Sequence, residues 1–141
     1  MPFHDAPATS SRRPIRSALA VIAGLILIVV LSLGTDQLFH SLGVYPPWGE
    51  PILDPILNGL ALVYRIVYAI IGCYVTASLA PYKPLSHAMG LGVIGVILYT
   101  AGAITTWNVG PNWYPIALIV AAIPASWIAG RLYIRNGTRR I

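Results

Sequence analysis

The sequence predicts an all-α fold: a polytopic membrane protein whose four transmembrane helices form an up-down bundle with both termini cytoplasmic. The 141-residue chain is 57% hydrophobic and only 9% charged, whereas soluble domains carry about 25% charged residues. Its apolar residues fall into four runs long enough to span a bilayer core of about 30 Å. Because backbone in lipid must satisfy its own hydrogen bonds, these runs are expected to be helical.

The first helix is expected at about 17–40. Its apolar pattern follows a cluster of arginines and fades before GVYPPWGEP at 43–51, a stretch rich in proline and glycine that is typical of a turn. The second helix is expected at about 55–80. Asp54 is a favourable N-cap residue and Pro55 suits the first helical position, so both predict a helix start here.

A tight turn, PYKP at 81–84, separates the second helix from a third expected at about 86–107. A second loop, NVGPNWYP at 108–115, precedes a fourth helix expected at about 115–134. Tyr and Trp favour the membrane–water interface, so the aromatic residues of the two long loops predict an aromatic belt. The belt residues are Tyr45, Trp48, Trp107, Trp113 and Tyr114.

These helices account for nearly all of the chain, so we expect one membrane domain at 14–135. Residues 1–13 are polar and should form a flexible cytoplasmic tail, and 136–141 a short basic one. The N-terminal stretch also resembles a signal peptide. Three further spans follow it, and its apolar pattern continues past Gly34, so we favour an uncleaved first helix.

Positive charge is distributed unevenly between the two sides of such a bundle. Of nine Lys and Arg residues, all but Arg65 precede the first helix, lie in the turn before the third or end the fourth. The positive-inside rule therefore predicts that both termini are cytoplasmic, and these charges do not indicate nucleic-acid binding. They are Arg12, Arg13, Arg16, Lys83, Arg131, Arg135, Arg139 and Arg140.

Small residues recur at about every fourth position of three helices, which favours close helix packing in lipid. Ala122 lies one residue off the row of the fourth helix, so we expect it to matter less. The rows are Ala61, Ala69, Cys73 and Ala77; Ala88, Gly92, Gly95 and Gly102; and Ala117, Ala121, Ala125 and Ala129.

Arg65 occupies the missing place in the row of the second helix, so we expect it to face the bundle interior. Asp36 is the candidate partner. It lies about 9 Å, and Arg65 about 15 Å, from the outer ends of their helices at 1.5 Å per residue. An arginine side chain spans the difference, and an intramembrane charge is costly unless it is paired. The sequence therefore predicts an Arg65–Asp36 charge pair.

Two alternatives stay open at this point. Asp36 could be an interfacial residue with Arg65 reaching toward outer phosphates, or Arg65 could serve a ligand or a transport path. Helical spacing places further polar side chains near the pair. These are Ser32, Gln37, His40, Tyr64 and Tyr68.

The sequence offers no other chemistry. A single cysteine, Cys73, excludes an intrachain disulfide and a cysteine-based metal site. His40 and His87 are expected on opposite sides of the membrane, so they cannot share a haem. With no nucleophile–base motif and no phosphate loop, we expect no catalytic residues, no metal, no cofactor and no enzyme activity.

Residues 70–133 carry an order of motifs: a Gly-Tyr-small helix end, a Pro-basic-Pro turn, a HAMGLG start and a Gly-Arg-Leu end. In this the chain resembles small four-helix inner-membrane proteins of bacteria with no established activity. The resemblance implies the same fold and supplies no site residue.

Two functions fit these observations. The first is a non-enzymatic membrane protein that acts through helix packing, as a homo-oligomer or as an accessory subunit of a membrane complex. The second is a small oligomeric transporter or channel that uses Arg65 with Asp36. The sequence names neither a protein partner nor a small-molecule or ion substrate.

Overall fold

A computed structural model describes residues 12–139 and is all-helical. Four helices are long and apolar enough to cross a membrane, so the chain is a multi-pass membrane protein. They are α1 (Arg12–Ser41), α2 (Pro55–Leu79), α3 (Pro84–Thr106) and α4 (Trp113–Thr138).

The helix ends depart from the predicted ones mainly at the termini. α1 already begins at Arg12 and α4 continues to Thr138, so parts of both predicted tails are helical. A glycine that ends a helix usually does so by adopting the left-handed conformation itself. Gly137 does not adopt this conformation, and α4 continues past it. The rest of the predicted tails, 1–11 and 140–141, lies outside the described residues.

The start of α2 follows the predicted capping. The Ile56 amide donates to Asp54 Oδ1 at 2.7 Å, and Pro55 occupies the first turn. The turn between α2 and α3 is tight. In it Lys83 adopts the left-handed conformation, with φ 41°, just before Pro84. That turn sets α3 close beside α2.

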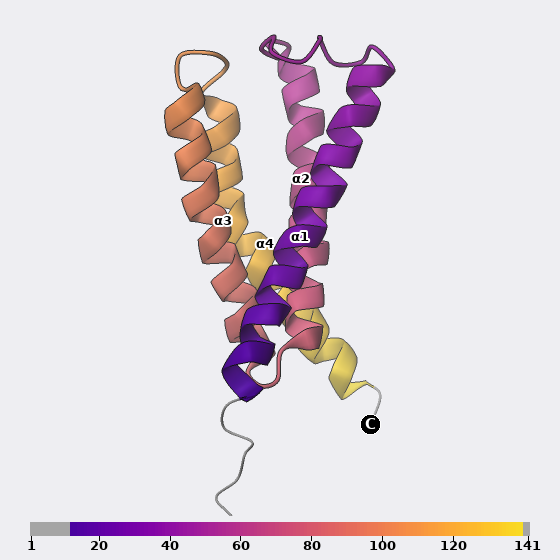
Figure 1. Ribbon diagram of the computed structural model, residues 1–141, viewed down its shortest axis with the longest axis vertical. Coiled ribbons are helices and arrows are strands. Elements are labelled where there is room, and N and C mark those ends of the chain that lie inside the picture. Colours follow the sequence, from indigo (N-terminus) through magenta and orange to yellow (C-terminus); the bar gives the residue numbers. More distant parts are fainter. Residues whose placement is uncertain (1–11, 140–141) are drawn as a thin grey trace, which may run out of the picture.

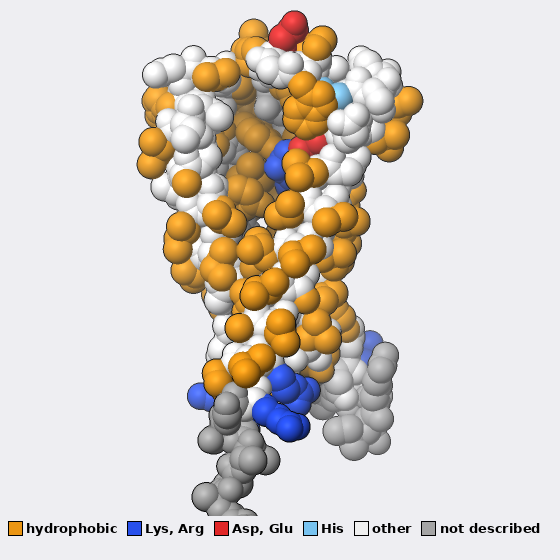
Figure 2. Space-filling model, in the orientation of Figure 1, with side chains coloured by type: hydrophobic (Ala, Val, Ile, Leu, Met, Phe, Trp, Pro, Cys, Tyr) orange, Lys and Arg blue, Asp and Glu red, His pale blue; other side chains and the backbone are white. Residues whose placement is uncertain are grey.

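The helices form two pairs, α1 with α2 and α3 with α4, and α2 also packs against α4. The pairs diverge toward one end, which we call the loop end because it carries loops 42–54 and 107–112 (Figure 1). We call the opposite end the basic end, since Lys and Arg side chains gather there (Figure 2). α1 contacts α3 only sparsely.

Small residues bring the helices together in the half near the basic end. A Cβ added at Gly24 would lie 2.5 Å from the Gly72 carbonyl, and one at Gly92 would lie 2.6 Å from Ser126 Cβ. Neither glycine therefore tolerates a side chain without a shift of its neighbour. Around these contacts lies the main core cluster, Cys73, Ala77, Ala88, Leu91 and Ala129.

The predicted packing rows hold only in part. Gly102 is exposed with nothing near its Cβ position, and Ala117 and Ala121 are half-buried. Ala122 is 6% exposed, so the expectation that it lies off the packed face was wrong. A spacing of four residues overshoots one helical turn by about 40° at each step, so a long row leaves the packed face. Ala125 and Ala129 are buried with Ala122.

Candidate functional site

Arg65 and Asp36 form an ion pair between α2 and α1. Arg65 Nη2 lies 2.5 Å from Asp36 Oδ2, and the two side chains are 27% and 9% exposed. α1 and α2 are consecutive helices that pack against each other, which brings the two residues to matching depths. The structure thus pairs Arg65 with an acid inside the protein. The snorkelling alternative would instead direct its side chain toward lipid phosphates.

Tyrosines extend this pair into a buried network. The Tyr64 hydroxyl donates to Asp36 Oδ1, so both carboxylate oxygens accept hydrogen bonds. Tyr45 lies 3.1 Å from the Tyr64 hydroxyl and must donate to it, since Tyr64 gives its single proton to Asp36. Burial raises the pKa of the Tyr45 phenol, which keeps that donor protonated.

The other predicted polar residues stand around the network without joining it. Tyr68 bonds Thr35 at 2.7 Å, and Gln37 accepts from Trp48 Nε1 at 3.1 Å. His40 Nδ1 lies 2.5 Å from the Pro46 carbonyl oxygen, and the centroid of its ring lies 4.0 Å from that of the Trp48 ring, with the two planes tilted by 32°. The contacts of Gln37 and His40 fasten loop 42–54 over the end of α1.

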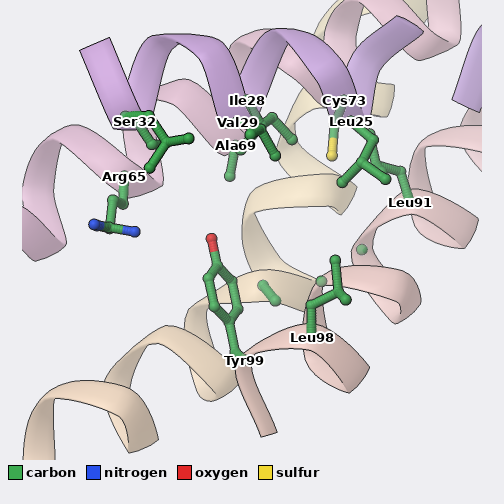
Figure 3. A pocket seen from close by; sticks show the side chains of 14 residues that line it. Leu25, Ile28, Val29, Ser32, Arg65, Ala69, Cys73, Leu91, Leu98 and Tyr99 are labelled. Carbon is green, nitrogen blue, oxygen red and sulfur yellow. The ribbon is translucent and has the colours of Figure 1, made fainter. Parts of the chain in front are cut away.

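Ser32 lines an apolar cleft of about 240 Å³ between α1, α2 and α3 (Figure 3). Arg65 lies toward its loop-end side, and Cys73 and Leu91 of the main core cluster also line it. Tyr99 projects into it from α3. Most of its wall is aliphatic, contributed by Leu25, Ile28, Val29, Leu33, Leu91 and Leu98.

A second cavity, of about 240 Å³, lies beneath loop 42–54. We call it the aromatic pocket; it combines the carboxylates of Asp36 and Glu50 with four aromatic residues and His40. Arg65 lines this pocket, the apolar cleft and a further cavity of about 390 Å³ near loop 107–112. The guanidinium therefore lies where these spaces meet. The aromatic residues are Tyr45, Trp48, Tyr64 and Tyr114.

Figure 2 shows a hollow in the surface of the loop-end half, and charged side chains of both signs are visible inside it. Arg65 Nε is buried and has no hydrogen-bond partner among residues 12–139. Of the five N–H donors of a guanidinium, one is bound to Asp36. The arginine thus retains capacity for a further acceptor.

The sequence assigned Tyr45 and Tyr114 to an aromatic belt, and the structure corrects this. Tyr45 is 3% exposed and Tyr114 packs against its cluster, whereas Trp48, Trp107 and Trp113 are exposed. Gly43, with φ 71°, ends α1, and the amides of the next two residues bond the Phe39 carbonyl. This turn directs Tyr45 inward. The glycine signals a turn in the sequence, but not its direction.

Other site residues had no signal in the sequence at all. Neither Tyr99 nor Thr35 belongs to a motif, and only the fold places them at the cleft and beside Tyr68. Asn58 is buried because its side-chain amide donates to the Ile52 and Asp54 carbonyls at 2.7 and 2.9 Å. Asn58 thus holds loop 42–54 against α2, and it also lines the aromatic pocket.

Among residues 12–139 no three His, Cys, Asp or Glu side chains are placed to hold a metal ion. A scan against protein-family models, a search of curated proteins and a search of solved structures each gave no match. Function must therefore be argued from the geometry of Arg65 and its surroundings.

Proposed function

We propose that this protein is a small, non-enzymatic ligand-binding or transport protein of the membrane, with Arg65 and Asp36 as its charged intramembrane site. The observation that carries the proposal is the position of Arg65, which lines both the apolar cleft and the aromatic pocket. A ligand in either space would contact the guanidinium. Ionisable residues within membrane spans commonly mark binding sites and transport paths.

The energetics support a ligand role over a purely structural one. Placing Arg at the centre of a membrane helix costs about 2.5–3.5 kcal/mol on insertion scales. The pair with Asp36 offsets part of this, but apolar residues would close the interface at lower cost. Among the described residues Arg65 makes one hydrogen bond, to Asp36, and its side chain lines three cavities. A site that binds an acceptor accounts for that arrangement.

A second candidate is a helix-packing role, as a homo-oligomer or as a subunit of a membrane complex. One observation favours it: α1 and α3 diverge toward the loop end (Figure 1), and residues of both helices line the apolar cleft. A helix of another chain could enter there. The small-residue rows support this role less than the sequence suggested, because Ala88, Gly92 and Ala129 already pack inside the chain.

We further propose that the basic end faces the cytoplasm of a bacterium and the loop end its periplasm. Basic residues of α1, the α2–α3 turn and α4 gather at one end, whereas Glu50 and Asp54 lie in loop 42–54 at the other. The positive-inside rule favours this orientation. The aromatic pocket would then face the periplasm.

The proposal is tested by what co-purifies with the protein. Wild-type, Arg65→Gln and Gly95→Leu proteins are purified in mild detergent, and their small molecules and lipids are compared by mass spectrometry after extraction. Gly95 lines the cleft, and a Cβ there would meet Ala122 at an ordinary 3.7 Å. Leucine at this position should therefore fill the cleft and leave the ion pair intact.

We expect at least one molecule to be enriched with the wild type and depleted with both variants. Gly90→Leu is the matched control, since Gly90 lies on the same helix, is exposed and has nothing near its Cβ position. Identical extracts from all four proteins would overturn the ligand role. A co-eluting protein lost on cleft filling would favour the packing role instead.

A further inference from the structure

We infer that the ligand is a zwitterionic phospholipid, with its phosphate on Arg65, its ammonium group in the aromatic pocket and one acyl chain in the apolar cleft. This inference rests on the proposed function and specifies its ligand. It draws on three features that meet at one residue: an aliphatic cleft, a partly exposed arginine with one hydrogen bond among the described residues, and a pocket that combines carboxylates with aromatic rings.

The apolar cleft suits a hydrocarbon chain. Its wall is aliphatic, and its volume of about 240 Å³ exceeds the roughly 150 Å³ of an engineered apolar cavity that binds benzene. Leu33 of α1 and Leu98 of α3 line the cleft and are 55% and 51% exposed, so they form a rim between diverging helices. In a membrane this rim faces lipid. A chain would therefore enter sideways from the bilayer.

Arg65 suits the phosphate. A guanidinium presents a planar fork of donors that matches phosphate oxygens. Among the described residues the guanidinium makes a single hydrogen bond, from Nη2 to Asp36, and the Arg65 side chain is 27% exposed, so other donors are open to a phosphate. Arg65 lines the loop-end side of the cleft, the place at which the head group of a lipid with its chain in the cleft would lie. Tyr99 lines the same cleft and offers a hydroxyl donor.

The aromatic pocket suits the ammonium group. Asp36 and Glu50 contribute carboxylates, and Tyr45, Trp48 and Tyr64 contribute rings. Cations bind favourably over the faces of Trp and Tyr and pair with carboxylates. Arg65 lines this pocket as well as the cleft. A phosphate on Arg65 would thus hold a short amino-alcohol head group beside the pocket.

Charge balance selects a zwitterionic head group over an anionic one. Asp36 already neutralises Arg65, so a phosphate alone would leave two negative charges sharing one guanidinium. Like charges brought together in a site are costly. A zwitterion avoids this, because its ammonium group compensates Asp36 while its phosphate compensates Arg65. The net charge of the site then stays the same when the lipid binds.

The test is native mass spectrometry on the full-length protein, stripped of lipid in detergent and titrated with dioleoyl phosphatidylethanolamine, dioleoyl phosphatidylglycerol or oleate. We expect at least about tenfold tighter retention of the ethanolamine lipid than of the glycerol lipid, equivalent to about 1.4 kcal/mol. Arg65→Gln and Gly95→Leu should reduce this retention, and Gly90→Leu should not. Asp36→Asn should abolish the preference, because it leaves Arg65 unbalanced and favours the anionic lipid.

Stronger Arg65-dependent retention of the glycerol lipid or of oleate would overturn the zwitterionic assignment and leave the charged site as a binding site. Equal retention of every lipid by every variant, as annular lipid only, would overturn the inference. In that case the proposed function would still stand if the extracts contained another molecule that depends on Arg65. The two failures are therefore distinguishable.

Discussion

Arg65 Nη2 and Asp36 Oδ2 lie 2.5 Å apart across the interface between α2 and α1. Both oxygens of Asp36 accept hydrogen bonds, one from Arg65 and one from Tyr64. Each carboxylate oxygen is therefore held by one donor, whereas the guanidinium makes only one hydrogen bond among residues 12–139. This asymmetry separates the roles of the two residues: Asp36 is held in place, and Arg65 is available to a ligand.

The first prediction concerns the stability of this pair. Asp36→Ala should destabilise the protein by about 2–4 kcal/mol, since breaking a buried pair leaves an uncompensated charge and arginine cannot shed its proton. Arg65→Ala should cost the same or less, because Asp36 can be protonated once it is stranded. The double mutant should recover part of the loss. A double-mutant cycle measured by unfolding in detergent checks this, and additive losses would contradict a coupled pair.

The second prediction concerns Tyr64. Tyr64→Phe removes the donor to Asp36 and the acceptor of Tyr45, so it should lower the free energy of unfolding by about 1–3 kcal/mol. Tyr68→Phe is the control. It removes one part-buried bond to Thr35 and should cost about 0.5–1.5 kcal/mol. Thermal unfolding of the two variants compares them, and a larger loss for Tyr68→Phe would argue against the network.

The third prediction concerns the packed face of α4. Ala122→Leu should overpack the contact with Gly92 and Gly95 and cost about 1–3 kcal/mol. Ala121→Leu should be milder, because Ala121 is half-buried and lines a small cavity beside Arg65. A thermal-shift series in one detergent distinguishes them. A larger loss of stability for Ala121→Leu than for Ala122→Leu would place the packed face on the predicted row that contains Ala121.

The fourth prediction concerns orientation. A reporter fused after Ile141 should behave as cytoplasmic, and one inserted beside Trp48 as periplasmic, because the basic end is retained inside. Adding arginines to loop 42–54 should weaken or invert this orientation. A periplasmic C-terminal reporter would reject it, as would a mature N-terminus near Gly34.

The sequence by itself determined the class of the protein and the approximate place of each helix. Composition and the length of the apolar runs suffice for this, because a bilayer of fixed thickness requires helices of about 20 residues whatever their neighbours. Local capping was equally readable: Asp54 and Pro55 start α2 as their side chains dictate. The position of Arg65 on an inward face could be inferred from helical periodicity, and so could Asp36 as the acid nearest in depth.

Only the tertiary structure decided which faces meet and where the bundle opens. Small-residue spacing predicted close packing on α4, but it placed Ala121 rather than Ala122 on the packed face. The rotation of a helix about its axis is set by its neighbours, so spacing alone could not decide between the two. The sequence predicted Tyr45 to be an aromatic residue of the surface. In the structure the turn at Gly43 directs its side chain toward Tyr64. The apolar cleft depends on the divergence of α1 from α3. That divergence follows from contacts summed over all four helices, and no local stretch of sequence encodes it.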